Sequence, residues 1–305
     1  MKKILLPTFV VIVLISALVA ATKVQWTKAG GGTIYINADG SVEGADKIFS
    51  SDNVTYTFLG DINDSIVVLR SNITIDGAGF TLNGTEAELW YGFQIEGYTV
   101  AVNVTIRNVN IVGCEVGIGL ISTNDNKVLE CNITDCNYGI WSSETWDNII
   151  SGNVISNNTC GIYFDTTFDN EVFGNNITDN DNGVWLSASS SNNKFHHNYF
   201  INNINQTQIE SGEVYPSNAW DDGYPSGGNY WSDYEERYPG VGDAYSGPNQ
   251  DVPGSDGFWD DPYVIAENNQ DNYPIVPEFS LLINVSLFMI ATLSIVMIYR
   301  RKQNI

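Results

Sequence analysis

A period of 22 residues runs through the middle of this chain. A glycine followed by a branched aliphatic residue recurs at this step, in Gly117 and Ile118, Gly139 and Ile140, Gly161 and Ile162, and Gly183 and Val184. A fixed period of this length is typical of solenoids, in which each repeat packs only against its neighbours. The repeat therefore limits the fold to a stack of similar units.

Each repeat contains three short segments in which apolar and polar residues alternate, separated by Asn, Asp or Gly. Alternation over so few residues indicates β-strands, and three strands with three bends make one turn of a parallel coil. The sequence predicts an all-β fold, a right-handed parallel β-helix with coils over residues 71–206. Strands over 22–70 are expected to cap its start, and an irregular segment over 207–276, rich in Gly, Asp and aromatic residues, is expected to cap its end.

Equivalent residues of successive coils should lie in columns about 4.8 Å apart. Aliphatic columns are expected to form the core, for example Ile111, Ile133, Ile155 and Ile177. At two bends the columns become asparagine ladders, because stacked amides can bond to each other and to turn backbone. One ladder follows Val109 and Cys131 with Asn153, Asn175 and Asn198, and the other follows Cys114 and Cys136 with Asn158, Asn180 and Asn203.

Two of the four cysteines, Cys114 and Cys136, are one period apart. Their α-carbons should therefore lie within the range that a disulfide accepts, and an exported protein permits such a bond. The alternative is a pair of small buried thiols that continue the asparagine ladder. The two histidines are adjacent rather than spaced around the cysteines, so the sequence shows no metal-ligand pattern.

The two ends of the chain carry export and membrane signals. Lys2 and Lys3 precede an apolar run that ends in small residues, which predicts a signal peptide over 1–21. An uncleaved N-terminal anchor is the alternative. Residues 281–299 are almost uninterruptedly apolar and are followed by a basic cluster, which predicts a membrane helix with a cytoplasmic tail over 303–305. The rest of the chain is then expected at the extracellular face of the cell membrane.

The net charge of −23 includes only 13 Lys and Arg residues. A surface of this charge repels nucleic acid and anionic lipid, so neither is an expected partner. Nine Asn-X-Ser/Thr sequons in an exported chain are candidate glycosylation sites. They are Asn53, Asn63, Asn72, Asn83, Asn103, Asn132, Asn157, Asn176 and Asn205.

Several segments resemble archaeal NosD-like β-helix surface proteins. They are TIYINADGSVEG, ITIDGAGFTLNG, the coils, NAWDDGYPSGGNYWSDY, SDGFWDDPYVI and DNYPI. The resemblance implies the β-helix fold and a surface location, and the family name implies copper delivery to a partner. Copper carriers need clustered soft or imidazole ligands, and this sequence has two neighbouring histidines and three methionines at its termini. Metal delivery is therefore kept only as a remote alternative.

Residues 277–302 resemble a PEF-CTERM sorting signal, with Pro277, Glu278 and Phe279 before the apolar span and the basic cluster. The resemblance implies processing by an archaeosortase, so that a lipid would replace the helix as the membrane anchor. A retained single-span anchor is the alternative.

One outward column of the coils contains Trp141, Tyr163 and Trp185. Three aromatic rings along one face form a flat apolar strip of the kind on which sugar rings lie. The carboxylates of Asp165 and Glu144 could accept hydrogen bonds from sugar hydroxyls. We therefore expect a binding protein for polysaccharide or envelope glycoprotein, unless a loop or the C-terminal cap covers this strip.

An enzyme is the alternative of another class. A polysaccharide hydrolase needs two carboxylates at a defined distance, and Asp135, Asp179 and Asp181 at the bends are the candidates. A lyase that acts on uronic acids is less favoured, because the coils contain few cations to neutralise a substrate carboxylate. The preferred interpretation is that the coils carry no catalysis.

A loop of the expected C-terminal cap is crowded with carboxylates. They are Asp243, Asp251, Asp256, Asp260 and Asp261. Hard oxygen ligands in a flexible loop are typical of Ca²⁺ sites, so this loop is a candidate calcium site. The alternative is a solvated acidic loop with no cofactor.

Overall fold

The computed structural model describes residues 32–44, 46–85, 89–96, 101–210, 212 and 216–277. The predicted signal peptide, the membrane helix and the basic cluster lie outside the described residues. Within those ranges, no helix is long and apolar enough to span a membrane.

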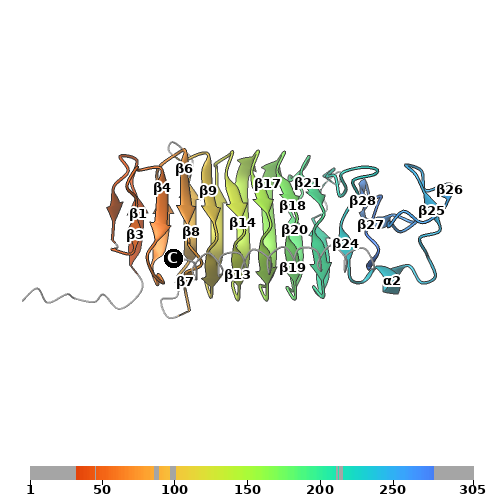
Figure 1. The fold of residues 1–305 in the computed structure, drawn as a ribbon, viewed down its shortest axis with the longest axis horizontal. Coiled ribbons are helices and arrows are strands. Elements are labelled where there is room, and N and C mark those ends of the chain that lie inside the picture. The colour runs from red at the N-terminus through yellow and green to blue at the C-terminus, as the bar shows by residue number, and fades with distance from the viewer. Residues whose placement is uncertain are drawn as a thin grey trace, which may run out of the picture. The chain divides into compact units, whose positions relative to one another are not determined.

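The strands of the coils form three sheets, to each of which a coil contributes one strand, so the predicted parallel β-helix is confirmed (Figure 1). Sheet A contains, in order, β2 (Val42–Glu43), β1 (Thr33–Ile36), β5 (Ser65–Val68), β8 (Tyr91–Glu96), β11 (Val116–Ile121), β14 (Tyr138–Trp146), β17 (Cys160–Phe168), β20 (Asn182–Leu186) and β23 (Asn205–Ile209). Sheet B contains β21 (Lys194–His196), β18 (Glu171–Phe173), β15 (Ile149–Ser151), β12 (Lys127–Leu129), β9 (Val104–Arg107), β6 (Ile73–Asp76), β4 (Thr55–Phe58) and β3 (Ile48–Phe49). Sheet C contains β24 (Tyr230–Trp231), β22 (Tyr199–Ile201), β19 (Asn176–Thr178), β16 (Val154–Ser156), β13 (Asn132–Thr134), β10 (Asn110–Val112) and β7 (Thr81–Asn83).

The coil arrangement begins earlier than the 22-residue period indicates. β1 pairs in parallel with β5, and β4 pairs in parallel with β6, so residues expected to form a separate cap already belong to the coil sheets. Within sheets A, B and C, only β2 and β3 run antiparallel to their neighbours, at the first edges of sheets A and B. Antiparallel edge strands of two residues leave little backbone for another chain to pair with.

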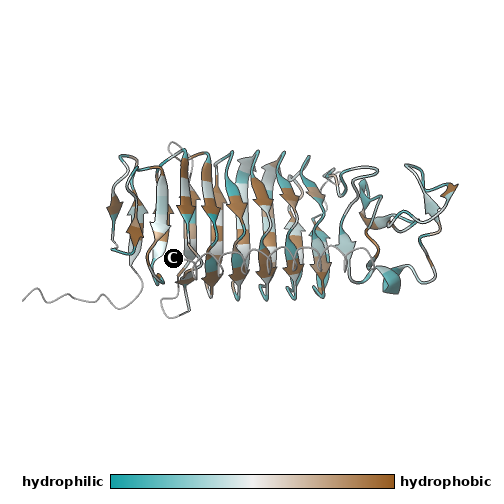
Figure 2. Ribbon diagram, in the orientation of Figure 1, coloured by the Kyte–Doolittle hydropathy of each residue, from teal (hydrophilic) through white to brown (hydrophobic). Residues whose placement is uncertain are grey.

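The predicted aliphatic columns form the core. Ile118, Ile140 and Ile162 pair in register on β11, β14 and β17, and each is fully buried. Hydrophobic positions recur on the strands of the coils, whereas the short helix α2 (Tyr234–Arg237) is hydrophilic (Figure 2). The inward side chain of each strand therefore packs on its equivalents in the coils above and below, which removes it from water.

Both predicted asparagine ladders are present. Asn175 Oδ1 accepts hydrogen bonds from the backbone N–H and from the side-chain amide of Asn153, both at 2.9–3.0 Å. Asn175 in turn donates to Asn198 Oδ1 in the same way. Because the amides are buried, each bond satisfies a group that would otherwise be costly to remove from water. A third ladder follows Asn126, Asn148, Asn170 and Asn193.

The bends between sheets C and A require an unusual backbone conformation. Asp135, Asn157, Asp179 and Asn202 occupy equivalent positions there and have φ between 55° and 57°. Asn and Asp adopt this left-handed region more readily than other residues with a side chain. The local backbone therefore favours these residue types at this bend.

The C-terminal cap continues the coils without their period. It contains α2, the pair β25 (Tyr245–Ser246) and β26 (Val252–Pro253), and the pair β27 (Tyr263–Ala266) and β28 (Asn269–Asp271). Asn193 is followed in its ladder by Asn218 and by Asn269, the first residue of β28. The core column continues through stacked rings: Trp231 stacks on Phe200 and Tyr263 stacks on Trp231, with centroids 4.4 and 4.1 Å apart.

Candidate functional site

The outer surface of sheet A carries the predicted aromatic residues in register. Trp141 pairs with Tyr163, and Tyr163 with Trp185, on β14, β17 and β20. Their ring centroids are 6.3 and 5.3 Å apart, and all three side chains are half-buried. We call these three residues the aromatic strip. The part of each ring that remains exposed faces outward, because the inward neighbours Ile140, Ile162 and Val184 fill the core.

Two further tyrosines extend this surface. The ring of Tyr138 lies 5.7 Å from Trp141 and 5.6 Å from Tyr163. Gly119 occupies the column of Trp141 one coil earlier, and a Cβ there would lie 2.6 Å from the ring of Tyr91. The absence of a side chain at Gly119 therefore leaves room for the Tyr91 ring beside the strip.

Polar groups border the aromatic strip. Trp185 donates its indole N–H to Glu210 Oε1 at 3.1 Å. Of the two predicted acceptors, Asp165 accepts a hydrogen bond from Ser143 Oγ at 3.4 Å and Glu144 accepts one from Ser122 Oγ at 3.0 Å. Burial raises the pKa of Tyr163 to about 12, so its hydroxyl is a neutral donor at physiological pH.

Positive charge is kept away from this surface. None of the sheet A strands contains Lys or Arg. Lys127, Arg107 and Lys194 belong to sheet B, and two of these pair with carboxylates on the same side, Arg107 with Asp76 and Lys194 with Asp222. The aromatic strip is therefore bordered by carboxylates with no cation on its own sheet.

The three carboxylates considered for hydrolysis do not form a buried pair. Asp135 and Asp179 occupy the same column two coils apart, which corresponds to about 10 Å. Asp181 lies two residues after Asp179 in the same bend before β20, and all three side chains are exposed. A general acid needs an environment that holds its proton, usually an apolar one, and the exposed setting of these carboxylates does not supply it.

The acidic loop of the cap uses its carboxylates to organise its own backbone. Asp243 accepts hydrogen bonds from the backbone N–H groups of Asp256 and Gly257, and Asp260 accepts two from Ala244 and Tyr245. Asp251 and Asp261 are exposed. Across the described ranges, no group of three or more His, Cys, Asp or Glu side chains is placed to hold a metal ion. Calcium binding by this loop stays a prediction, since its carboxylates already stabilise turns of the loop.

The four cysteines are free and buried, so the disulfide between Cys114 and Cys136 is not formed in this structure. The two residues stack one coil apart, and each thiol donates to a backbone carbonyl two residues earlier, Cys114 to Val112 and Cys136 to Thr134. The ladder that begins with these residues therefore changes from thiols to amides at Asn158.

Of the nine sequon asparagines, seven are exposed, whereas Asn83 and Asn176 are half-buried. Glycosylation at the exposed positions remains a prediction.

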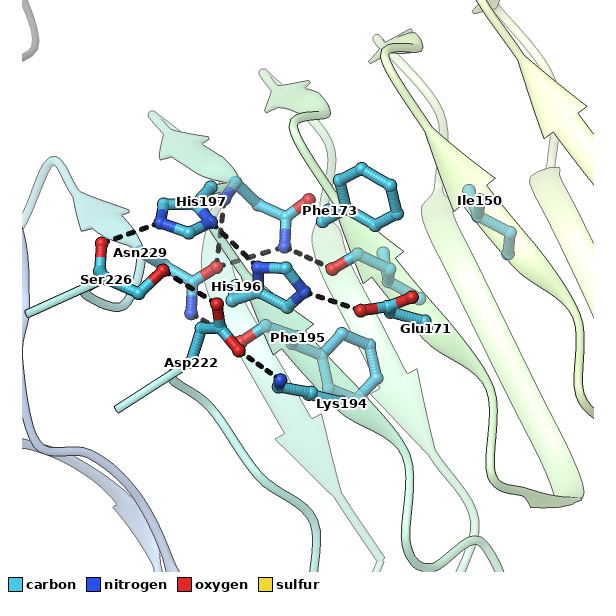
Figure 3. A network of polar contacts seen from close by, with 12 residues as sticks. Ile150, Glu171, Phe173, Lys194, Phe195, His196, His197, Asp222, Ser226 and Asn229 are labelled. Carbon is cyan, nitrogen blue, oxygen red and sulfur yellow. Dashed lines mark hydrogen bonds and ion pairs between the residues drawn. The ribbon is translucent and has the colours of Figure 1, made fainter. Parts of the chain in front are cut away.

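A polar network joins the last regular coil to the cap, and sequence reasoning missed it (Figure 3). His196 and His197 lie with their Nδ1 atoms 2.7 Å apart. The outer nitrogen of His196 is 3.0 Å from Glu171 Oε1, and that of His197 is 2.8 Å from the carbonyl oxygen of Ser226. The sequence shows the histidines as neighbours, but their partners come from a strand 25 residues earlier and a loop 29 residues later.

The contacts of this network set how many protons it holds. The carbonyl of Ser226 can only accept, so His197 carries a proton on Nε2, and one further proton lies between the two Nδ1 atoms. The contact between His196 and Glu171 then needs a further proton. Burial lowers the pKa of His196, and the Glu171 carboxylate opposes this effect. The network binds the cap to the coils.

The chain is similar to one known protein family and to several solved structures. A family model described as "NosD: Periplasmic copper-binding protein (NosD)" matches residues 23–236. An alginate lyase from Paenibacillus sp. str. FPU-7 is 12% identical with a TM-score of 0.31, over 56% of this chain and 75% of that chain. The A-module of the mannuronan C-5 epimerase AlgE6 from Azotobacter vinelandii is 14% identical with a TM-score of 0.32, over 71% of this chain and 87% of that chain.

A third solved structure, ORF18 of Geobacillus virus E2, is 18% identical with a TM-score of 0.25, over 58% of this chain and 31% of that chain. No curated protein matches the chain.

The described residues do not fit the copper ion that the family description implies. The two imidazoles bond directly to each other, and their outer nitrogens contact Glu171 and Ser226. The four thiols are buried among the coils, and the methionines lie outside the described residues. Copper needs several such donors with free lone pairs around one point, and the described part of the chain does not bring them together.

Proposed function

The chain belongs to the NosD family, whose model matches residues 23–236, and we propose that it is an exported β-helix protein that binds neutral polysaccharide. The aromatic strip of Trp141, Tyr163 and Trp185 is the proposed binding surface. We place the protein at the outer face of the cell membrane, tethered through its C-terminal segment or a replacement lipid. The periplasmic description of the family supports export.

The register of the strip is the observation that carries this proposal. The three rings repeat once per coil, at about 4.8 Å along the stack. This step is comparable with the length of one pyranose ring, so successive sugars of a chain that runs along the coils can each contact one aromatic residue. Aromatic faces bind the C–H groups of sugars, whereas the bordering carboxylates of Asp165 and Glu210 accept hydrogen bonds from hydroxyls.

The charge of the surface supports a neutral ligand over an acidic one. A uronic acid polymer would bring one carboxylate per sugar beside Glu144, Asp165 and Glu210, with no cation on sheet A to offset the repulsion. Neutral glycans avoid this cost. The proposal includes no catalytic step, because the exposed Asp135, Asp179 and Asp181 do not provide a proton donor in an apolar setting.

Two variants of the same strand test the proposal. Tyr163→Ala removes the central ring of the strip, and Phe168→Ala, the matched control, removes another outward ring of β17 that is 37% exposed. The full chain in detergent is titrated with soluble mannan, β-glucan and alginate by affinity electrophoresis. We expect Tyr163→Ala to weaken binding of a neutral polymer about ten-fold, and Phe168→Ala to bind like the parent.

Two results would contradict the proposal. One is equal binding by Tyr163→Ala and the parent, and the other is a preference for alginate over both neutral polymers. A parallel assay for new reducing ends separates binding from hydrolysis. Turnover that disappears in Asp135→Asn would favour the hydrolase alternative instead.

A further inference from the structure

The coil that precedes the regular repeats is interrupted by an insertion. Residues 84–90 connect β7 with β8, whereas residues 113–115 make the same connection in the next coil. Trp90 lies at the corner between sheets C and A, where its backbone carbonyl accepts a hydrogen bond from Val116 N–H at 2.7 Å. The backbone of Trp90 is held at the sheet in this way, and its side chain is 61% exposed.

The same corner lacks the side chains that later coils place there. The bend column of Asp135, Asn157 and Asp179 begins with two glycines, Gly84 and Gly113, as the strand register shows. A Cβ at Gly84 would lie 2.7 Å from Cys114 Sγ, and one at Gly113 would lie 2.4 Å from Thr85 Oγ1. These distances show that close packing requires both glycines, and beside them the corner holds a hollow of about 450 Å³, lined by both glycines together with Thr85, Trp90, Glu115 and Asp135.

The lining of this hollow combines an aromatic face with hydrogen-bond acceptors. Glu115 is half-buried, and its Oε1 accepts a hydrogen bond from Asn137 Nδ2 at 2.7 Å, which orients the carboxylate. Asp135 is held at the rim by its left-handed backbone. No Lys or Arg is among the residues that line the hollow. A ligand that fits must offer hydroxyl donors and an apolar ring face, and it must carry no negative charge.

We propose that this hollow binds the terminal sugar of a neutral glycan, with the pyranose ring stacked on Trp90 and its hydroxyls donating to Glu115 and Asp135. This inference rests on the proposed function, because the sugar in the hollow would be the terminal sugar of the same polysaccharide that lies on the aromatic strip. Tyr91 follows Trp90 directly, and its ring lies over Gly119 in the column of Trp141. The hollow is therefore adjacent to the first aromatic residues of the same sheet.

Short and long probes separate the hollow from the strip. Mannotriose, cellotriose and chitotriose, and the matching hexasaccharides, are titrated by calorimetry into the full chain in detergent. A trisaccharide can fill the hollow but reaches little of the strip. We expect Trp90→Ala to weaken trisaccharide binding about ten-fold, since it removes the stacking face, and Asp135→Asn to weaken it roughly three- to ten-fold.

Matched controls exclude effects on the fold. Asp135→Asn introduces the residue that Asn157 already supplies in the next coil, so the left-handed bend is retained. Asp179→Asn changes the same column outside the hollow, and Trp146→Ala removes an exposed tryptophan from the same sheet. Both controls should bind trisaccharides like the parent. Tyr163→Ala should also retain trisaccharide binding while losing the additional affinity for hexasaccharides.

The inference fails if no trisaccharide binds the parent, or if Trp90→Ala and Asp135→Asn both bind as tightly as the parent. Neutral polymer binding that still depends on Tyr163 would in that case leave the proposed function standing. If polymer binding to the strip were lost while trisaccharides still bound in a Trp90-dependent way, the inference would stand and the proposed function would fail.

Discussion

The carboxylate of Asp271 accepts a hydrogen bond from the backbone N–H of Asn229 at 2.7 Å. Asn229 is itself the acceptor for Asn198, the last ladder residue of the regular coils. Asp271 also accepts from the indole of Trp231 at 2.9 Å and from the N–H of Tyr273 at 3.0 Å. A ladder of amides must end at a group that accepts without needing a further acceptor, and a carboxylate meets that requirement.

The pH dependence of stability should report this ladder end. Complete burial raises the pKa of Asp271 from 3.8 to about 7, although the three N–H groups that donate to its carboxylate act to lower it. Because the folded pKa is the higher one, its contribution to stability is complete at low pH and is lost as the pH rises through about 7. This difference between the folded and the ordinary pKa of Asp271 corresponds to a free energy of about 4 kcal/mol. We expect the midpoint temperature of thermal unfolding to decrease as the pH is raised from about 5 to about 8. This decrease should be smaller in Asp271→Asn than in the parent. Equal slopes for the two proteins would contradict the role of Asp271.

The register of the core can be tested within one strand. Ile155 is fully buried between Ile133 and Ile177, whereas Val154 beside it on β16 is 40% exposed. Ile155→Asp places a carboxylate in the apolar column and should abolish the cooperative unfolding transition seen by circular dichroism. Val154→Asp, the control, should change stability by about 0.5 kcal/mol or less. If both variants melted like the parent, the inward column would be assigned to the wrong residues.

The stacked thiols of Cys114 and Cys136 should form a disulfide when an oxidant is supplied. With oxidised glutathione, the two thiols lose two electrons and two protons in total and the glutathione disulfide is reduced. Burial raises the pKa of Cys131 and Cys160 to about 12, so these thiols should stay unreactive. Peptide mapping after alkylation should find one cross-link, between Cys114 and Cys136. A cross-link that includes Cys131 or Cys160, or none at all, would show that the coil stacking does not bring this pair into reach.

Copper should not bind the histidine pair in the folded protein. The direct hydrogen bond between the Nδ1 atoms of His196 and His197 leaves no room for an ion, and both outer nitrogens are occupied. Titration with copper(II) should therefore shift the unfolding midpoint equally in the parent and in His197→Asn, a residue that tolerates the left-handed backbone at this position. Stabilisation specific to the parent and reversed by a chelator would indicate a copper centre.

The coils were predictable because their physics is local and repeated. The step of 22 residues places Ile118 on Ile140, and the structure confirms this pairing. The direction of the aromatic strip follows from the same register, since Trp141 is the next residue after Ile140 and neighbouring residues of a strand face opposite sides. The hollow beside Trp90 was not predictable, because it arises where an insertion and two glycines break the period.

The amino-acid sequence by itself determined the coil register and the asparagine ladders, since identical side chains one period apart must stack when the strands pair in parallel. The tertiary structure alone decided how the ladders end and what lies at the corners of the sheets. Asn229 and Asp271 reach the ladder from segments of the cap that have no common spacing. Such contacts depend on where long loops return to the core, and no period in the sequence encodes that.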